Sequence, residues 1–201
     1  MRFHEWLCDK LIRNVVNRRA PDFVVGGFDD PYLHRWYLTP WSKYDRQNPP
    51  FWSQVTRRLL PNVYLHKFLR SDDDRALHDH PWFNVSFLLQ GSYIEETIRA
   101  GGVKVRTRRD AGALKLRSPW ASHRVELLQV LTKYNGDRDG GPITLENVEA
   151  EMRDQPCWTL FMTSPRVREW GFHCPDAGWV MWKNFVSGAA DGNNIGKGCN
   201  Q

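Results

Sequence analysis

A succession of short apolar stretches, separated by turns rich in glycine, proline and aspartate, runs from Asn62 to Val186 and limits the fold most strongly. Stretches of this length, with no long helical pattern between them, predict antiparallel strands joined by hairpins. A hairpin is expected about Gln90-Gly91, and further turns are expected at Ala100-Gly101-Gly102 and Asp110-Ala111-Gly112. We therefore expect an all-β barrel or sandwich of roughly eight to ten strands.

The residues before this region have a different pattern. Within His4–Arg18, apolar residues recur every four positions, which predicts an amphipathic helix that packs on its own domain. Aromatic residues dominate Asp29–Pro61, where we expect a strand at Tyr32–Leu38 and a short helix at Phe51–Leu60. The predicted organisation is an extension over residues 1–61, a barrel over 62–187 and a disordered tail over 188–201.

The segment Gln129–Pro156 is the least regular part of the predicted barrel. Its centre, Asn135–Pro142, is rich in glycine and aspartate and predicts a surface loop. A helical turn is expected within Leu145–Met152. The loop is interpreted either as a lid over a site or as an inert insertion. Three further strands are expected at Cys157–Thr163, Arg168–His173 and Gly178–Val186.

Composition restricts the location and the partners. The sequence has no apolar run near 18 residues, and charged residues interrupt Met1–Lys10, so we expect a cytoplasmic protein without a membrane span. The cysteines are widely spread and form no Cys-x-x-Cys pair, which predicts reduced thiols. The net charge of +5 permits nucleic-acid binding along the basic stretch Lys104–Arg117 but does not favour it.

The sharpest functional signal is His78-Asp79-His80. Side chains two apart on an extended strand point to the same face, so both imidazoles can reach one ion. Imidazole is a common ligand for zinc, iron, nickel and copper. His66, in the preceding predicted strand, is a weaker candidate for the same site.

Three residues separate His80 from Asn84, and six more separate Asn84 from Gly91. This spacing resembles the first motif of the cupin superfamily, in which a glutamate stands where this chain has Asn84. Downstream, a glycine, a proline turn and His123 resemble the second cupin motif. Here the proline-to-histidine distance is one residue short, and Ala121 replaces a glycine. The resemblance covers about 62–186 and extends to small cupin-like proteins of phage and bacterial genomes.

The resemblance implies a cupin-type double-stranded β-helix, or jelly-roll barrel, with an N-terminal amphipathic helix. It also implies that His78, His80 and His123 are the metal ligands. Without the glutamate, three neutral imidazoles leave a divalent ion with its full charge and with open positions. Such a site is similar to those of three-histidine cupin dioxygenases, which favours Fe(II) over Zn, Mn or Ni.

Several residues near the histidines are candidates for substrate binding. Asn84 shares the parity of His78 and His80, and a glutamate on the return strand, Glu95 or its neighbour, could instead supply a carboxylate ligand. Two tryptophans could line the pocket. Two arginines that flank the histidines could bind a carboxylate or phosphate. The set comprises Arg75, Trp82, Asn84, Glu95, Trp120 and Arg124.

The function expected from these patterns is an Fe(II)-dependent oxygenase acting on a small anionic substrate. One alternative is an isomerase, lyase or hydrolase that uses the metal as a Lewis acid. Another is a non-enzymatic module that binds a small molecule or nucleic acid. The cupin resemblance also implies that two barrels pair as a homodimer.

Overall fold

The computed structural model describes residues 1–26, 29–42, 50–72, 76–135, 148–185 and 199. Its strands form two six-stranded sheets and a separate hairpin, and every strand pairing is antiparallel. The first sheet contains, in spatial order, β1 (Phe23–Val25), β2 (Leu33–Tyr37), β3 (Asn62–Phe68), β12 (Cys157–Thr163), β5 (Asn84–Gln90) and β8 (Leu114–Arg117). The second sheet contains β14 (Gly178–Met181), β13 (Gly171–Cys174), β4 (Leu77–His78), β9 (His123–Leu127), β6 (Ser92–Ile98) and β7 (Lys104–Asp110).

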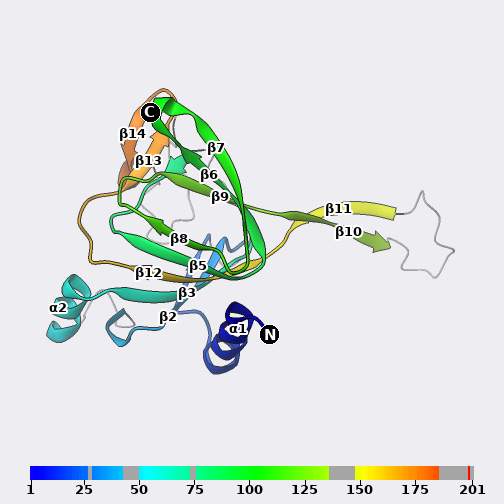
Figure 1. Cartoon of the computed structure of the whole chain (residues 1–201), viewed down its shortest axis with the longest axis horizontal. Coiled ribbons are helices and arrows are strands. Elements are labelled where there is room, and N and C mark those ends of the chain that lie inside the picture. Colours follow the sequence, from blue (N-terminus) through cyan, green and yellow to red (C-terminus); the bar gives the residue numbers. More distant parts are fainter. Residues whose placement is uncertain (27–28, 43–49, 73–75, 136–147, 186–198, 200–201) are drawn as a thin grey trace.

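The chain passes back and forth between the two sheets. It runs through β4 in the second sheet, β5 in the first, β6 and β7 in the second, β8 in the first and β9 in the second. Figure 1 shows the two sheets facing each other and enclosing an interior. This alternation is the topology of a cupin-type double-stranded β-helix, so the predicted all-β jelly roll is confirmed.

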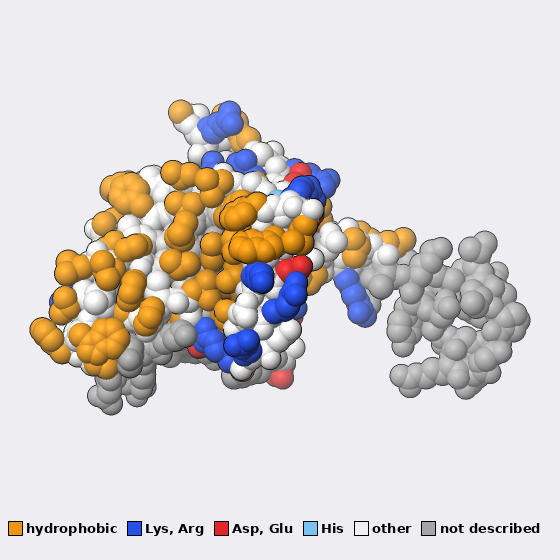
Figure 2. All heavy atoms as spheres, turned by 60° about the horizontal axis from the view of Figure 1, so that its bottom comes forward, with side chains coloured by type: hydrophobic (Ala, Val, Ile, Leu, Met, Phe, Trp, Pro, Cys, Tyr) orange, Lys and Arg blue, Asp and Glu red, His pale blue; other side chains and the backbone are white. Residues whose placement is uncertain are grey.

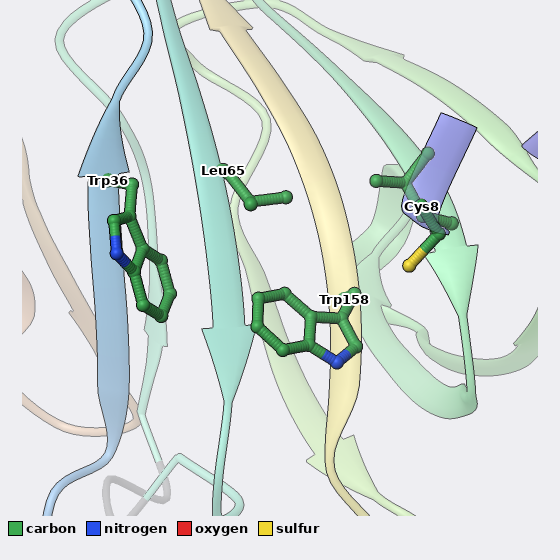
Figure 3. Packing of buried hydrophobic residues seen from close by; sticks show 5 residues of the cluster. Cys8, Trp36, Leu65 and Trp158 are labelled. Carbon is green, nitrogen blue, oxygen red and sulfur yellow. The ribbon is translucent and has the colours of Figure 1, made fainter. Parts of the chain in front are cut away.

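The N-terminal region is built into the barrel wall. Helix α1 (Phe3–Asn14) lies against β5, and a short 3₁₀ turn, η1 (Val16–Arg18), follows it. Figure 3 shows part of the cluster beneath the helix, where Cys8, Leu65 and the stacked rings of Trp36 and Trp158 are buried. Because β2 pairs with β3, the extension continues the first sheet across the predicted boundary at residue 61.

The other short elements include one difference from the predicted pattern. The helix expected near Phe51 is α2 (Phe51–Leu59), and 3₁₀ turns η2 (Pro40–Ser42) and η3 (Ala100–Gly102) occur in connections. The last predicted strand ends at Met181, and a helical turn, α3 (Trp182–Phe185), follows it. In the described part of the chain, each helix is too short or too polar to cross a lipid bilayer.

The prediction of a helical turn within Leu145–Met152 is wrong for its described part. Strands β10 (Gln129–Asn135) and β11 (Val148–Asp154) pair in continuous register, and Figure 1 shows this hairpin extending away from the barrel. From Val148, apolar residues alternate with charged ones, a period of two that favours a strand. The predicted surface loop falls mainly on residues 136–147, outside the described residues.

The prediction of four reduced cysteines is also wrong. Cys174, on β13, forms a disulfide with Cys199, which is in the segment predicted to be a disordered tail. Most of that segment lies outside the described residues. Cys8 and Cys157 are free and buried. Burial raises the pKa of the Cys8 thiol to about 11 and that of Cys157 to about 12, so both stay protonated at neutral pH.

One face of the molecule is strongly apolar. Figure 2 shows hydrophobic side chains gathered on the side that lies at the bottom of Figure 1. Helix α2 exposes Phe51 and Leu59, and the outward side of edge strand β8 exposes Leu114 and Leu116. Contiguous apolar surfaces often mark interaction sites. The predicted homodimer stays a prediction.

Candidate metal centre

The three predicted ligands come from two neighbouring strands of the second sheet. His78 ends β4 and pairs directly with His123, the first residue of β9. His80 follows β4 by two residues. The ring centroids lie 5.0 Å apart for His78 and His123, 5.1 Å for His80 and His123, and 5.2 Å for His78 and His80. Among the described residues, one ligand atom from each histidine lies within 4.8 Å of the others.

This geometry suits a transition-metal ion. The Nε2 atoms of His80 and His123 are 2.8 Å apart. Two neighbouring nitrogens on an ion with bonds of about 2.1 Å are roughly 3 Å apart, so these atoms already have nearly the separation that a shared ion imposes.

Burial keeps at least two of the imidazoles neutral. It lowers the pKa of His80 well below its ordinary value, and the nearby His78 and Arg117 lower it further. Burial also lowers the pKa of His123 strongly, with Arg117 as the next cause. A neutral imidazole has a free nitrogen lone pair, which is the form that binds a metal.

Glu95, predicted as a substrate or ligand residue, lies behind His123. It is fully buried on β6, and its Oε1 is 3.7 Å from His123 Nδ1, the nitrogen facing away from His80. Arg117 Nε donates to Oε1 at 2.8 Å, and Arg109 Nε donates to Oε2 at 3.0 Å. Burial would raise the pKa of Glu95, but Arg117 and Arg109 outweigh it and hold the pKa below its ordinary value. The charged carboxylate therefore faces the arginines and the outer nitrogen of His123.

Asn84 stands where the cupin motif that this sequence resembles has a glutamate. It is buried on β5, between Thr163 of β12 and Arg117 of β8 in the strand register. Its Oδ1 accepts a hydrogen bond from Arg117 Nη1 at 3.5 Å. Because the amide oxygen faces a guanidinium, Asn84 presents its Nδ2 atom, which is a donor and cannot bind a metal.

The remaining residues predicted to bind substrate lie at different distances from the three histidines. Trp82 is half-buried and parallel to the ring of His80, with centroids 6.2 Å apart. Trp120 is 65% exposed and contacts Phe83 rather than the histidines. Arg124 alternates with the inward His123 and donates to the backbone oxygen of Asp72, so its predicted substrate role is not supported. Arg75 lies outside the described residues.

Asp79 stands between two of the histidines, but no sequence pattern singled it out. Its buried carboxylate accepts hydrogen bonds from Gly171 N at 2.8 Å, Arg168 Nη1 at 2.9 Å and Trp179 Nε1 at 2.9 Å. His173 Nε2 lies 3.2 Å away. Arg168 Nη1 also donates to Pro119 O, in the turn before His123. Asp79 therefore fixes both histidine-bearing segments to the loop that precedes β13.

His66 faces the same interior but lies outside the cluster. It is buried on β3, and its Nε2 accepts a hydrogen bond from Arg35 Nε at 2.8 Å. Burial lowers its pKa well below 6.5, and the charges of Arg35 and His80 act in the same direction. His66 is thus a neutral acceptor in the folded protein.

This depressed pKa predicts a pH dependence of stability. Below pH 6.5 the unfolded chain protonates His66 while the folded protein does not, so the stabilisation present above pH 6.5 is lost as the pH falls. The contribution is about 1.4 kcal/mol per pH unit until the folded pKa is reached. His66→Gln, whose side-chain oxygen can still accept from Arg35, should remove that part of the slope. Urea unfolding of both proteins between pH 7 and pH 5 measures it; parallel slopes would contradict the assignment.

Comparisons with known proteins give a likeness in structure alone. No family model and no curated protein matches the sequence. An oxalate decarboxylase from Lactobacillus farciminis is 12% identical, with a TM-score of 0.41 over 74% of this chain and 33% of that one. The 11S globulin procruciferin from Brassica napus is 6% identical, with a TM-score of 0.42 over 75% and 30%. A double-stranded β-helix protein from Klebsiella pneumoniae is 13% identical, with a TM-score of 0.34 over 56% and 73%.

This chain thus spans about a third of the length of the first two structures. Its fold is assigned from its own strand order: a cupin-type jelly roll with three histidines gathered at one place in the interior.

Proposed function

We propose that this chain is a metal-dependent cupin enzyme in which His78, His80 and His123 hold a divalent transition metal, with Fe(II) favoured. The reaction proposed is an oxygenation of a small anionic substrate. The observation that carries the proposal is the convergence of three imidazoles with no described carboxylate among them. Glu95, whose Oε1 lies 3.7 Å from His123 Nδ1, is bound by two arginines.

The chain's own residues would prepare such a centre. The carboxylate of Glu95 favours a proton on Nδ1 of His123, which leaves Nε2 free to bind the ion. The ring of Trp82 lies parallel to that of His80, with centroids 6.2 Å apart. When bound, Fe(II) would supply one-electron redox chemistry together with open coordination positions.

The charges near the cluster favour an anionic substrate. His80 and His123 are neutral, so they do not offset the charge of a divalent ion. Glu95 carries one negative charge, and both Arg109 and Arg117 contact it, which leaves an excess positive charge beside the histidines. An anion entering this interior would gain electrostatic energy that a neutral analogue would not.

The test begins with protein purified from cells without chelators. We expect about one transition-metal ion per chain, with iron restoring the site after anaerobic removal of the metal. Nitric oxide, a diatomic probe of open positions, should change the electron paramagnetic resonance spectrum of the Fe(II) protein. A metal-loaded protein whose spectrum nitric oxide leaves unchanged would contradict the oxygenase and favour Lewis-acid chemistry by Zn, Mn or Ni. A protein that takes up no metal would contradict both.

A further inference from the structure

We propose that the Nδ2 atom of Asn84 and the hydroxyl of Thr163 form the binding site for a carboxylate group of the substrate, beside the three histidines. The inference rests on the proposed function and gives its substrate a chemical class. It assigns Asn84 a role in binding substrate, at the position where the cupin motif has a metal-binding glutamate.

The first observation is a pair of adjacent buried polar groups that lack partners. Asn84 on β5 and Thr163 on β12 are directly opposite each other in the antiparallel register. They are 3% and 2% exposed. Within the described residues, neither Asn84 Nδ2 nor Thr163 Oγ1 has a hydrogen-bond partner. A buried polar group left unpaired costs about 1–3 kcal/mol, so two side by side indicate a place for a ligand.

The orientation of the amide decides which kind of ligand fits. Arg117 has only donors, and it contacts the Oδ1 atom of Asn84, so Nδ2 is the atom left to bind a ligand. The hydroxyl of Thr163 can also donate. Opposite side chains in an antiparallel pair have Cβ atoms about 4.5–5.5 Å apart. A carboxylate, with two acceptor oxygens, can bridge two donors at that spacing.

The charges select an anion over a neutral acceptor. Arg117 is buried beside Asn84 and shares Glu95 with Arg109, so two guanidinium groups face one carboxylate. A carboxylate on Asn84 and Thr163 would therefore balance the excess positive charge in this part of the interior.

The position of the pair also places it close to the histidines. Arg117 joins the two sites: it contacts Asn84 on one side, and on the other it contacts Glu95, whose Oε1 is 3.7 Å from His123 Nδ1. A substrate carboxylate held by Asn84 would thus lie beside the residues that support His123. The rest of a small substrate could then extend toward the histidine cluster.

The experiment measures acetate binding by calorimetry in the Co(II)-loaded and the metal-free protein. Acetate is the simplest carboxylate, acetamide is its neutral counterpart, and azide is an anion that binds metal without needing two donors. Thr163→Val removes the hydroxyl at constant shape and should weaken acetate about tenfold, the effect of one hydrogen bond to a charged group. Thr163→Ser should retain binding, and Asn84→Asp should repel acetate.

Thr159→Val is the matched control. Thr159 is also a buried threonine without a partner among the described residues, on the inner side of the same strand, about 13 Å away along β12. The Thr159→Val protein should bind acetate with the same affinity as the unaltered protein. Acetate binding that is equal in Thr163→Val, Asn84→Asp and the unaltered protein, or absent from the unaltered protein, would overturn the inference.

The two proposals can fail separately. If Co(II) is not bound, the metal-dependent function is wrong, and the metal-free titrations still decide whether Asn84 and Thr163 bind a carboxylate. If Co(II) and azide bind normally and neither substitution changes the affinity for acetate, the proposed metal centre is supported and the proposed carboxylate site is wrong.

Discussion

Replacing His123 by alanine is expected to weaken binding of Co(II) more than about a hundredfold. Loss of a residue that merely supports a ligand already costs about 10–100-fold in metal affinity, and His123 supplies a ligand atom itself. The Nε2 atoms of His123 and His80 are 2.8 Å apart, so both can bind the same ion. Titration with Co(II), followed by the visible absorption of the bound ion, measures the change.

His66→Gln is the control for that titration. His66 is a buried imidazole in the same interior, but it is occupied by Arg35 and lies outside the cluster of three. It should bind Co(II) as the unaltered protein does. Equal affinities for the unaltered protein and His123→Ala would show that residue 123 is not a ligand. A large loss in His66→Gln would place the ion elsewhere.

Replacing Asp79 by asparagine is expected to lower the free energy of unfolding by about 3 kcal/mol. The side chain keeps its shape but loses its charge, which leaves the guanidinium of Arg168 partly buried without its carboxylate. Gly171 N and Trp179 Nε1 also donate hydrogen bonds to this carboxylate. The substitution therefore weakens several hydrogen bonds together. Denaturant unfolding of the metal-free protein measures the loss without the effect of a bound ion.

Asp110→Asn is the comparison for Asp79. Asp110 also accepts hydrogen bonds from an arginine, Arg108, and from Ser92, but it is on the surface. Exposed ion pairs contribute little, so this substitution should leave the unfolding midpoint nearly unchanged. If both substitutions had the same small effect, Asp79 would not be the buried connection between the histidine segments and β13.

The fold was predictable because its signals are local. Glycine turns mark the ends of several strands, at Gly91, Gly101-Gly102 and Gly112. The strand predicted at Cys157–Thr163 is β12. The hairpin predicted about Gln90-Gly91 is wrong, because that turn joins β5 and β6, which belong to different sheets. The helical turn expected near Met152 was wrong, because the period-two alternation from Val148 should have outweighed the irregular composition around it. The disulfide of Cys174 could not be read from spacing, since it depends on where residue 199 returns in space.

The histidine cluster was predicted from the spacing of two motifs, and the register between β4 and β9 brings them together. Its surroundings depend on contacts between strands that are distant in sequence. Arg117 on the first sheet binds Glu95 on the second. Asp79 binds Arg168, which is 89 residues further along the chain. No periodicity within one segment encodes such pairs. Arg124 was predicted to bind substrate, although its alternation with the inward His123 already placed its side chain on the other face of the strand.

The proposed function requires that three imidazoles hold one ion inside the barrel. A crystal structure of the Co(II)-loaded protein, with anomalous diffraction at the cobalt edge, tests it directly. We expect one strong peak bonded at about 2.1 Å to nitrogens of His78, His80 and His123. A peak bound elsewhere, or one that omits any of the three imidazoles, would contradict it.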